Sequence, residues 1–210
     1  MHIIFDFDGT LVDSYHCVLE KCLLLAEEFK LRKIQQDEIP TLRDLSSEQL
    51  IKYLQVPLHK IPKLILAIRK HLCSEMQKLK PVEGIPAVIE KLHHSGFSLG
   101  ILTSNSNENV TTWLEQNKLH PFFNFIKTES KFFSKKNVLS KILKSNQMDK
   151  TKTFYIGDET RDVEAAKKTG VKSIAVTWGY NSEKALLQYQ PDFIAQEPKN
   201  ILETLEPLSR

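Results

Sequence analysis

The first ten residues of the chain, MHIIFDFDGT, constrain its fold more than any other stretch. Residues 3–5 form a short β-branched and aromatic run, which is typical of a strand buried in a parallel sheet. The run ends at Asp6 and Asp8, which are not core residues, and at a turn around Gly9. Because ligands bind at the carboxyl ends of strands in an open α/β sheet, these acids indicate a site at that edge.

Asp6 and Asp8 lie two residues apart, so they share one face of an extended backbone. Acids held this close repel each other, and burial further disfavours their charged forms. Either a cation neutralises them, which indicates a magnesium site, or one acid stays protonated and serves as a general acid. The alternative is that they only cap the next helix, but a cap needs one acid rather than two.

Length and composition describe an ordinary globular protein. The 210 residues allow one α/β domain and a small second one, and 41% of them are hydrophobic and 26% charged. The net charge is only +3 and the lysines are scattered, so we expect no nucleic-acid partner. The three cysteines form no C-x-x-C pair, so neither a disulfide framework nor a zinc site is expected.

The sequence contains no apolar stretch of membrane-spanning length, and acids interrupt the N-terminal apolar run almost at once. We therefore expect a cytoplasmic protein without a signal peptide or a membrane partner. A monomer is the default expectation for its oligomeric state, and a dimer is possible.

The pattern from Ser14 to about Lys80 is helical and contains no strand. Apolar residues recur at helical spacing after Asp13, Ser47 and Pro62, and a polar stretch that ends at Pro40 marks a break. An all-helical segment between the first two strands is predicted to form a separate lid. We expect a core domain of residues 1–13 and 81–210 and a helical domain of residues 14–80.

The rest of the chain alternates between strand and helix patterns. Strands are predicted at residues 97–102, 123–126, 153–156, 173–177 and, briefly, 193–194. This alternation predicts an α/β fold with a Rossmann-like parallel sheet and helices on both of its faces.

The second predicted strand ends in Thr103, Ser104, Asn105 and Ser106, which open the next helix. Backbone N–H groups at a helix start bind anions, and the helix dipole strengthens this preference. The alternative is that Ser104 or Ser106 simply caps the helix.

Acids also follow the fourth predicted strand, in the segment Gly157-Asp158-Glu159-Thr160-Arg161-Asp162. Asp158 and Asp162 are four residues apart, so they point the same way once the helix has begun. Acids in a first helical turn are ordinary partners of the helix dipole, which explains Glu159. The helix dipole does not explain why acids crowd the ends of two strands, with Asp6 and Asp8 after the first and Asp158 and Asp162 after the fourth.

These segments together resemble the four motifs of the haloacid dehalogenase superfamily. Asp6, Asp8 and Thr10 match D-x-D-x-T of motif I, Thr103 matches motif II, and Gly157, Asp158 and Asp162 match G-D-x-x-x-D of motif IV. The helical segment lies where the superfamily places a small helical cap. The chain looks closest to the phosphoglycolate-phosphatase-like branch, including Pro81-Val82-Glu83-Gly84 and Trp178-Gly179-Tyr180.

The lysine of motif III is the least specific match. Lys135 takes this position in the form F-x-K before an apolar helix, with Lys136 as the alternative and Lys131 third. No Pro-x-Pro follows the lysine as it does in many relatives, and Ser46 stands where they often have Gly. Arg43 lies within reach of a substrate anion, but a solvated arginine at a helix end is the favoured interpretation.

The resemblance implies a magnesium-dependent phosphomonoester hydrolase that acts on a small, phosphoglycolate-like metabolite through an aspartyl-phosphate. Asp6 would be the nucleophile, and Asp8 would donate and accept protons. Mg²⁺ would be held by Asp6, Asp158 and the backbone carbonyl of Asp8. Thr103, Ser104, Asn105 and Lys135 would hold the phosphoryl group, with Thr10, Glu159 and Asp162 supporting the site.

Two other functions stay open at this point. A phosphomutase of the same fold would use Asp8 to deprotonate a sugar hydroxyl instead of water, and would require a bisphosphate activator. A protein that binds a phosphorylated ligand without catalysis would have kept the same site.

Overall fold

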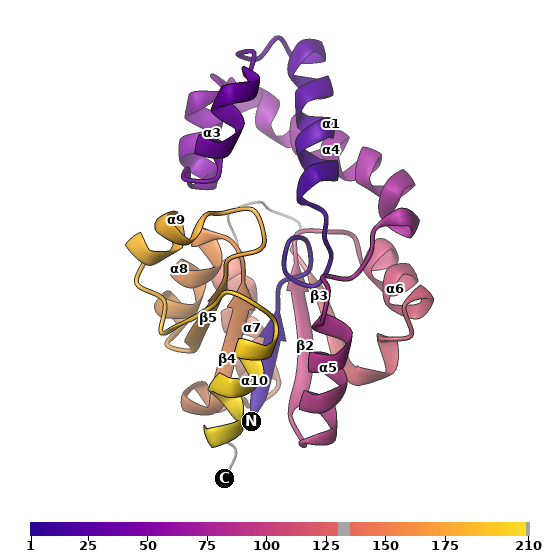
Figure 1. The fold of residues 1–210 in the computed structure, drawn as a ribbon, viewed down its shortest axis with the longest axis vertical. Helices are drawn as coiled ribbons and strands as arrows, with labels where there is room; N and C mark the ends of the chain where they lie inside the picture. The colour runs from indigo at the N-terminus through magenta and orange to yellow at the C-terminus, as the bar shows by residue number, and fades with distance from the viewer. Residues whose placement is uncertain (130–134, 209–210) are drawn as a thin grey trace.

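The computed structural model describes residues 1–129 and 135–208 (Figure 1). Six parallel strands form one sheet in the order β3-β2-β1-β4-β5-β6. The strands are β1 (His2–Phe5), β2 (Ser98–Thr103), β3 (Phe123–Thr128), β4 (Thr153–Gly157), β5 (Lys172–Val176) and β6 (Phe193–Ala195). The predicted α/β fold with a parallel sheet is confirmed.

Helices cover both faces of this sheet (Figure 1). They are α5 (Ile85–His94), α6 (Asn107–Gln116), α7 (Lys135–Ser145), α8 (Thr160–Thr169), α9 (Glu183–Gln188) and α10 (Lys199–Leu205). Because side chains alternate along a strand, Ile3 and Phe5 pack with residues of α5, α6 and α10, whereas Ile4 packs with residues of α7 and α8. The central strand is thus buried on both faces, as its continuous apolar run predicts.

The chain changes direction across the sheet at β1. This strand pairs with β2 on one side and with β4 on the other, so Phe5 lies opposite both Ile101 and Ile156. In a doubly wound sheet such a switch point opens a crevice beyond the carboxyl ends of the strands. The polar residues that follow β1, β2 and β4 therefore reach the same edge.

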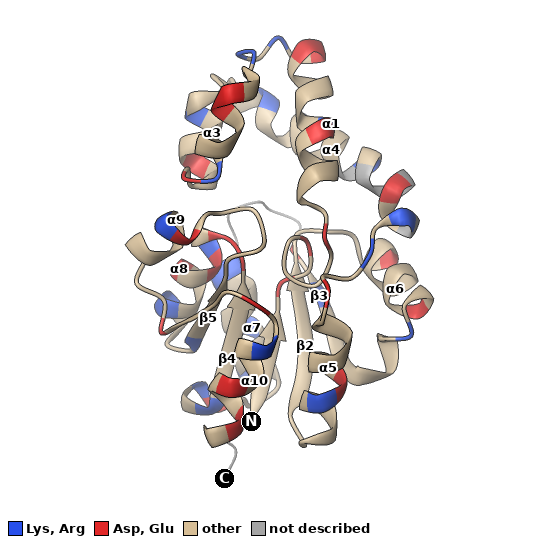
Figure 2. Cartoon of the chain, viewed as in Figure 1, with Lys and Arg blue, Asp and Glu red and all other residues tan. Residues whose placement is uncertain are grey.

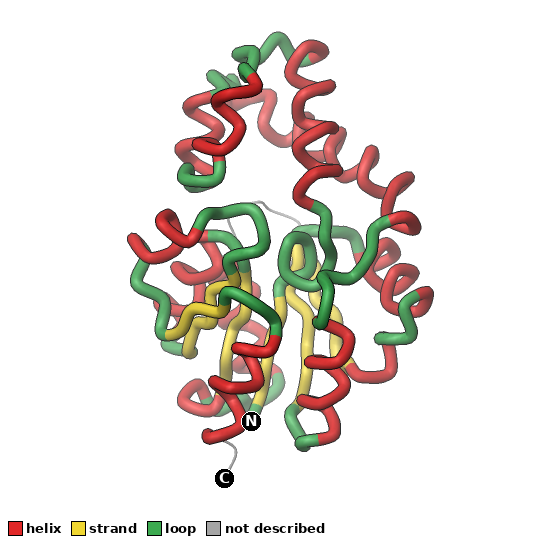
Figure 3. The backbone as a smooth tube through the Cα atoms, in the orientation of Figure 1, coloured by secondary structure: helices red, strands yellow, loops and turns green. Residues whose placement is uncertain are grey.

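Four helices lie between β1 and α5, namely α1 (Tyr15–Glu28), α2 (Ile39–Leu42), α3 (Ser47–Tyr53) and α4 (Ile61–Glu75). We call residues 14–80 the helical insertion. It extends beyond the carboxyl edge of the sheet and contains helix and loop but no strand (Figures 1 and 3). Leu25, Phe29 and Leu54 belong to an apolar cluster of its own. The predicted domain boundaries stay a prediction.

One break predicted within the insertion is wrong. Pro40 does not end a segment but occupies the first turn of α2, directly after a 3-10 helix over Gln36–Glu38. Proline fits there because the first N–H groups of a helix have no partner within the helix. Further 3-10 turns lie at Leu58–Lys60, Met76–Lys78, His120–Phe122, Lys150–Lys152 and Glu206–Leu208.

Positive and negative residues are interspersed over the helices of both parts of the chain (Figure 2). None of the helices in the described ranges combines the length and the apolar character needed to cross a lipid bilayer.

Candidate active site

Asp6 lies directly beyond β1, at the centre of the carboxyl edge. Its N–H donates to the carbonyl oxygen of Ile156 at 2.8 Å, so the backbone of the sheet fixes its position. Asp6 is only 3% exposed, and its Oδ2 accepts a hydrogen bond from Nζ of Lys135 at 2.6 Å. A carboxylate thus stands on a rigid strand end with a buried cation beside it.

Asp158 follows β4 and is completely buried. Its Oδ1 accepts from Oγ1 of Thr10 at 2.7 Å, and its Oδ2 accepts from N–H of Tyr180 at 2.7 Å. A Cβ atom added at Gly179 would lie 2.2 Å from Oδ2 of Asp158, so the loop approaches this closely only because residue 179 has no side chain. Two segments distant in sequence therefore hold Asp158.

Asp162 lies in the first turn of α8 and is also buried. Its Oδ2 accepts from N–H of Glu159 at 3.0 Å, which caps the helix. Its Oδ1 accepts from Lys135 and, at 3.2 Å, from the hydroxyl of Tyr155. The sequence analysis places Asp162 in a supporting position, and the structure brings it to Asp6 through their common lysine.

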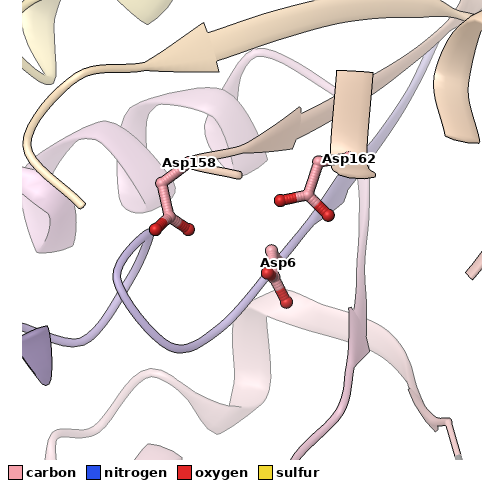
Figure 4. A group of neighbouring side chains, drawn as sticks. All are labelled: Asp6, Asp158 and Asp162. Carbon is pink, nitrogen blue, oxygen red and sulfur yellow. The ribbon is translucent and has the colours of Figure 1, made fainter. Parts of the chain in front are cut away.

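One carboxylate oxygen from each of Asp6, Asp158 and Asp162 lies within 4.8 Å of the other two, and the three carboxylates face a common space (Figure 4). Lys135 balances one of the three negative charges. Burial raises the pKa of Asp6 to about 7 and raises that of Asp158 well above its ordinary value. Buried oxygen donors with excess negative charge fit a hard divalent cation, which would neutralise them.

The two described lysines considered for motif III differ sharply in their surroundings. Lys135 is 3% exposed and contacts both Asp6 and Asp162, whereas Lys136 is exposed. Burial alone lowers the pKa of Lys135, but the two carboxylates hold it above its ordinary value. Lys135 therefore stays charged. Lys131 lies outside the described residues.

Asp8 lies in a different environment from Asp6. Its Oδ2 accepts from Nδ2 of Asn105 at 3.0 Å, and burial raises its pKa to about 6. Its Oδ1 is buried without a hydrogen-bond partner among the described residues, and Asp8 borders the cavity above the sheet edge. The carboxylate thus has one oxygen available to a ligand.

Thr103, Ser104 and Asn105 form the end of β2 and the following turn. Oγ1 of the buried Thr103 accepts from N–H of Asn105 at 2.9 Å. Oδ1 of Asn105 accepts from N–H of Ser106 at 2.8 Å and from Nδ2 of Asn109 at 3.0 Å. Both ends of the Asn105 amide are therefore engaged, and one of them orients Asp8. Simple helix capping applies to Ser106, whose Oγ accepts from N–H of Asn109.

Arg161 is a residue of this site that the sequence analysis missed. It pairs with Glu159 at 2.7 Å and donates to Oγ of Ser104 at 3.2 Å, so it links the ends of β4 and β2. Burial raises the pKa of Glu159, but Arg161 and other donors outweigh this effect and lower it. A cation in the first turn of a helix opposes the helix dipole, and this was the available signal.

Tyr180 was noted in sequence only as part of a motif. Its hydroxyl forms a 2.9 Å hydrogen bond with Oγ of Ser14, which also accepts from N–H of Gly9 at 3.1 Å. Nε1 of Trp178 donates to the carbonyl oxygen of Thr10 at 3.1 Å. Loop 178–180 therefore supports the turn that carries Asp8.

Arg43 is only partly exposed and its guanidinium is bonded to the core, so the favoured interpretation of a solvated helix-end arginine is wrong. Its guanidinium donates to the carbonyl oxygens of Thr177 at 3.1 Å and Gly179 at 2.7 Å, and it lies 5.1 Å from the ring centre of Tyr15. Helical periodicity does not reveal these contacts, because their acceptors are backbone atoms more than 130 residues away. Ser47 also contacts the core, by donating to Glu159 at 2.9 Å.

The chain is similar in sequence and in structure to known hydrolases and phosphatases. A family model described as haloacid dehalogenase-like hydrolase matches residues 3–176. The sequence is 31% identical over 208 residues to a phosphoglycolate phosphatase from Synechococcus elongatus, which covers 99% of this chain and 98% of that protein. It is 26% identical over 217 residues to pyrophosphatase PpaX from Anoxybacillus flavithermus, with 99% and 98% covered. The structure of a predicted phosphatase from Clostridium acetobutylicum superposes with a TM-score of 0.80 at 25% identity, covering 96% and 98% of the two chains.

Proposed function

The chain belongs to the haloacid dehalogenase-like hydrolase family, and on this basis we propose that it is a magnesium-dependent phosphomonoesterase. The observation that carries the proposal is the position of Asp6, which lies at a rigid strand end between a buried lysine and two further acids. Such a carboxylate is suited to attack phosphorus and form an aspartyl-phosphate.

The metal would be held by Asp6, Asp158 and the backbone carbonyl of Asp8, with Asp162 close to the same space. Magnesium prefers oxygen ligands and retains several waters, which suits a set of few carboxylates. When bound, it would neutralise charge on the phosphoryl oxygens.

The reaction would proceed in two steps at the sheet edge. Oδ of Asp6 attacks phosphorus while the ester P–O bond breaks, and Asp8 donates a proton to the leaving oxygen. Asp8 then accepts a proton from the water that attacks the aspartyl-phosphate, which releases inorganic phosphate and restores the Asp6 carboxylate. Thr103, Ser104 and Lys135 would hold the phosphoryl oxygens, and Asn105 would orient Asp8.

We further propose that the core domain comprises residues 1–13 and 81–210, and that the helical insertion is a cap that covers the site. The contacts of Arg43 with loop 177–179 and of Ser47 with Glu159 support this role. Covering the site excludes water from the phosphoryl group until the ester has been cleaved. The relatives' names make phosphoglycolate and pyrophosphate the first compounds to assay.

The test is hydrolysis of p-nitrophenyl phosphate, a phosphomonoester, with and without Mg²⁺ by the wild type and by Asp6→Asn. The variant should lose measurable turnover. After incubation with a ³²P-labelled substrate, only the wild-type protein should carry bound label, and hydroxylamine should release that label. Asp13→Asn is the matched control, because Asp13 is an exposed acid in the same segment. Retained turnover in Asp6→Asn would exclude Asp6 as the nucleophile.

A further inference from the structure

A cavity of about 270 Å³ separates the catalytic edge of the sheet from the helical insertion. Its lining includes Asp6, Asp8 and Thr103 at the sheet edge and side chains of all four helices of the insertion. The cavity is therefore continuous with the atoms that would receive the phosphoryl group, and any organic group attached to the phosphate must extend into it.

The part of the cavity formed by the insertion is aliphatic. Helix α4 contributes four lining residues at positions i, i+3, i+4 and i+7, namely Ile61, Leu64, Ile65 and Ile68. This spacing places them on one face of the helix, and all four stay partly exposed. Helix α1 adds Val18 and Leu19 to the same lining, and α3 adds Leu50 and Ile51. Apolar surface of this kind gains free energy only when an apolar group covers it.

The charged groups around the cavity do not favour an anionic ligand there. Arg43 and Arg161 are the cationic side chains among the described lining residues. Nη2 of Arg43 donates to two backbone carbonyls, whereas its buried Nε has no hydrogen-bond partner among the described residues. Arg161 is paired with Glu159. The remaining charged residues of the lining, Asp6, Asp8 and Glu159, are acids. A second anionic group on the substrate would thus meet acids and aliphatic carbon.

We propose that the organic group of the substrate is uncharged and apolar, and that it packs against the aliphatic face of α4 and against Leu19. This inference rests on the proposed phosphatase function and names its substrate class. The phosphate supplies the charge that the acids, lysine and metal bind, while the remainder is recognised by burial alone. Each buried methylene should improve kcat/KM about fourfold. A carboxylate in the same place would lose its hydration without gaining a partner.

The first experiment measures kcat/KM with Mg²⁺ for n-alkyl phosphates from ethyl to octyl phosphate. These esters share nearly the same leaving-group chemistry, so differences report on binding of the chain. We expect a rise of about fourfold per methylene until the cavity is filled. Hexyl phosphate should exceed its analogue with a terminal carboxylate by at least tenfold. A flat series, or equal rates for these two esters, would overturn the proposal.

The second experiment uses paired variants on one helix. Leu19→Asn changes a lining residue of α1, whereas Leu24→Asn changes a residue of the same helix that is 61% exposed. Leu19→Asn should lower kcat/KM for hexyl phosphate roughly tenfold, while Leu24→Asn should not. Leu24→Asn should hydrolyse acetyl phosphate, which has no alkyl chain beyond one methyl group, at the wild-type rate. Leu19→Asn should lose far less of this activity than of its activity on hexyl phosphate. Equal loss with both variants would contradict the assigned role of Leu19.

The two proposals fail in different ways. If the wild type does not hydrolyse p-nitrophenyl phosphate with Mg²⁺, the phosphatase function is overturned and this inference with it. If it hydrolyses p-nitrophenyl phosphate but shows no preference among the alkyl phosphates, the inference alone is overturned. If Leu19→Asn fails to fold, Ile65→Asn and its control Leu66→Asn repeat the comparison on α4, since Leu66 is 67% exposed.

Discussion

Asp6 and Asp8 lie two residues apart, yet their surroundings assign them different chemistry. Burial raises the pKa of Asp6 to about 7, while the Lys135 ammonium 2.6 Å away favours its charged form, which the proposed nucleophile needs. Oδ2 of Asp8 accepts a hydrogen bond from the neutral amide of Asn105, and burial raises the pKa of Asp8 to about 6. It is protonated below that pH and charged above it, which allows it to donate and then accept a proton near neutrality.

The first prediction concerns Asp8→Asn. Loss of the acid and base should lower kcat for alkyl phosphates about 100- to 10,000-fold. With p-nitrophenyl phosphate, whose leaving group needs no proton, the first step should survive and the second should not. A rapid burst of nitrophenol equal to the enzyme concentration, followed by slow turnover, is the expected trace. Equal loss with both substrates and no burst would contradict the two-step role of Asp8.

A second prediction concerns Gly179, whose missing side chain leaves room for Asp158. In Gly179→Ala the added Cβ atom would lie 2.2 Å from Oδ2 of Asp158, so this carboxylate must move. The concentration of Mg²⁺ needed for half-maximal activity should rise about 10- to 100-fold, as when a group that orients a ligand is lost. Gly96→Ala is the control for backbone strain alone, because its φ of 81° disfavours alanine although its Cβ would meet nothing within 4 Å. It should leave the Mg²⁺ requirement unchanged. An unchanged Mg²⁺ requirement would argue against Asp158 as a ligand.

Sequence alone predicts the position of the acids at the sheet edge, because each follows an apolar run at a strand end; their roles stay a prediction. Asp6, Asp8 and Asp158 fall at the expected edge for that reason. Arg161 and Tyr180 were not predicted as parts of the site. Their roles depend on partners brought close by the sheet order, such as Ser104 for Arg161, and local periodicity carries no information about such partners.

At the scale of whole elements, the strands and the main helices were predictable because each carries a periodic apolar pattern. The end of β3 was predicted two residues too early, at Ile126. Lys127 and Thr128 are exposed and polar, yet they pair with Leu102 and Thr103 of β2 and extend the strand. Backbone pairing at the sheet edge determines this end, and an apolar pattern does not report it.

A third prediction concerns Glu38, whose carboxylate is hydrogen bonded to the loop before it and to helix α3 of the insertion. It accepts from N–H of Gln35 at 2.8 Å, from the hydroxyl of Tyr53 at 2.6 Å and from Arg32 at 2.5 Å. These bonds, with that from Gln35 foremost, lower its pKa from 4.5 to about 2. Because these bonds favour the charged carboxylate in the folded state, Glu38 stabilises the fold above pH 4.5. This contribution is lost as the pH falls towards 2 and Glu38 becomes protonated.

The measurement is urea unfolding of the wild type and of Glu38→Gln at pH 6 and at pH 3. The variant should be less stable at pH 6, and the difference between the two proteins should shrink at pH 3. Glu48→Gln, at an exposed acid of α3, should resemble the wild type at both values. An equal difference at both pH values would show that the charge of Glu38 does not stabilise the fold.

At the scale of the whole molecule, residues 43–47 of the insertion are hydrogen bonded to Glu159 and to the segment 177–184 beside Asp158. Arg43 donates to the carbonyl of Gly179, and N–H of the adjacent Tyr180 donates to Asp158. Nδ2 of Asn181 donates in turn to the carbonyl oxygen of Arg43 at 3.0 Å. Arg43 therefore both donates to and accepts from the segment 179–181. A movement of the insertion therefore acts directly on the loop that orients Asp158.

The last prediction follows from this connection. Arg43→Ala removes two hydrogen bonds from a charged donor, each of which contributes about 1.5–3 kcal/mol in general. Part of that free energy would hold the insertion over the site, so kcat/KM for alkyl phosphates should fall roughly 10- to 100-fold. Hydrolysis of acetyl phosphate, which makes little contact with the insertion, should fall less. Lys33→Ala, at an exposed cation of the insertion, should behave as the wild type.

If Arg43→Ala lowered both activities equally and also raised the Mg²⁺ requirement, Arg43 would act by supporting the loop beside Asp158. A loss confined to the longer esters would instead show that it holds the insertion closed around the organic group.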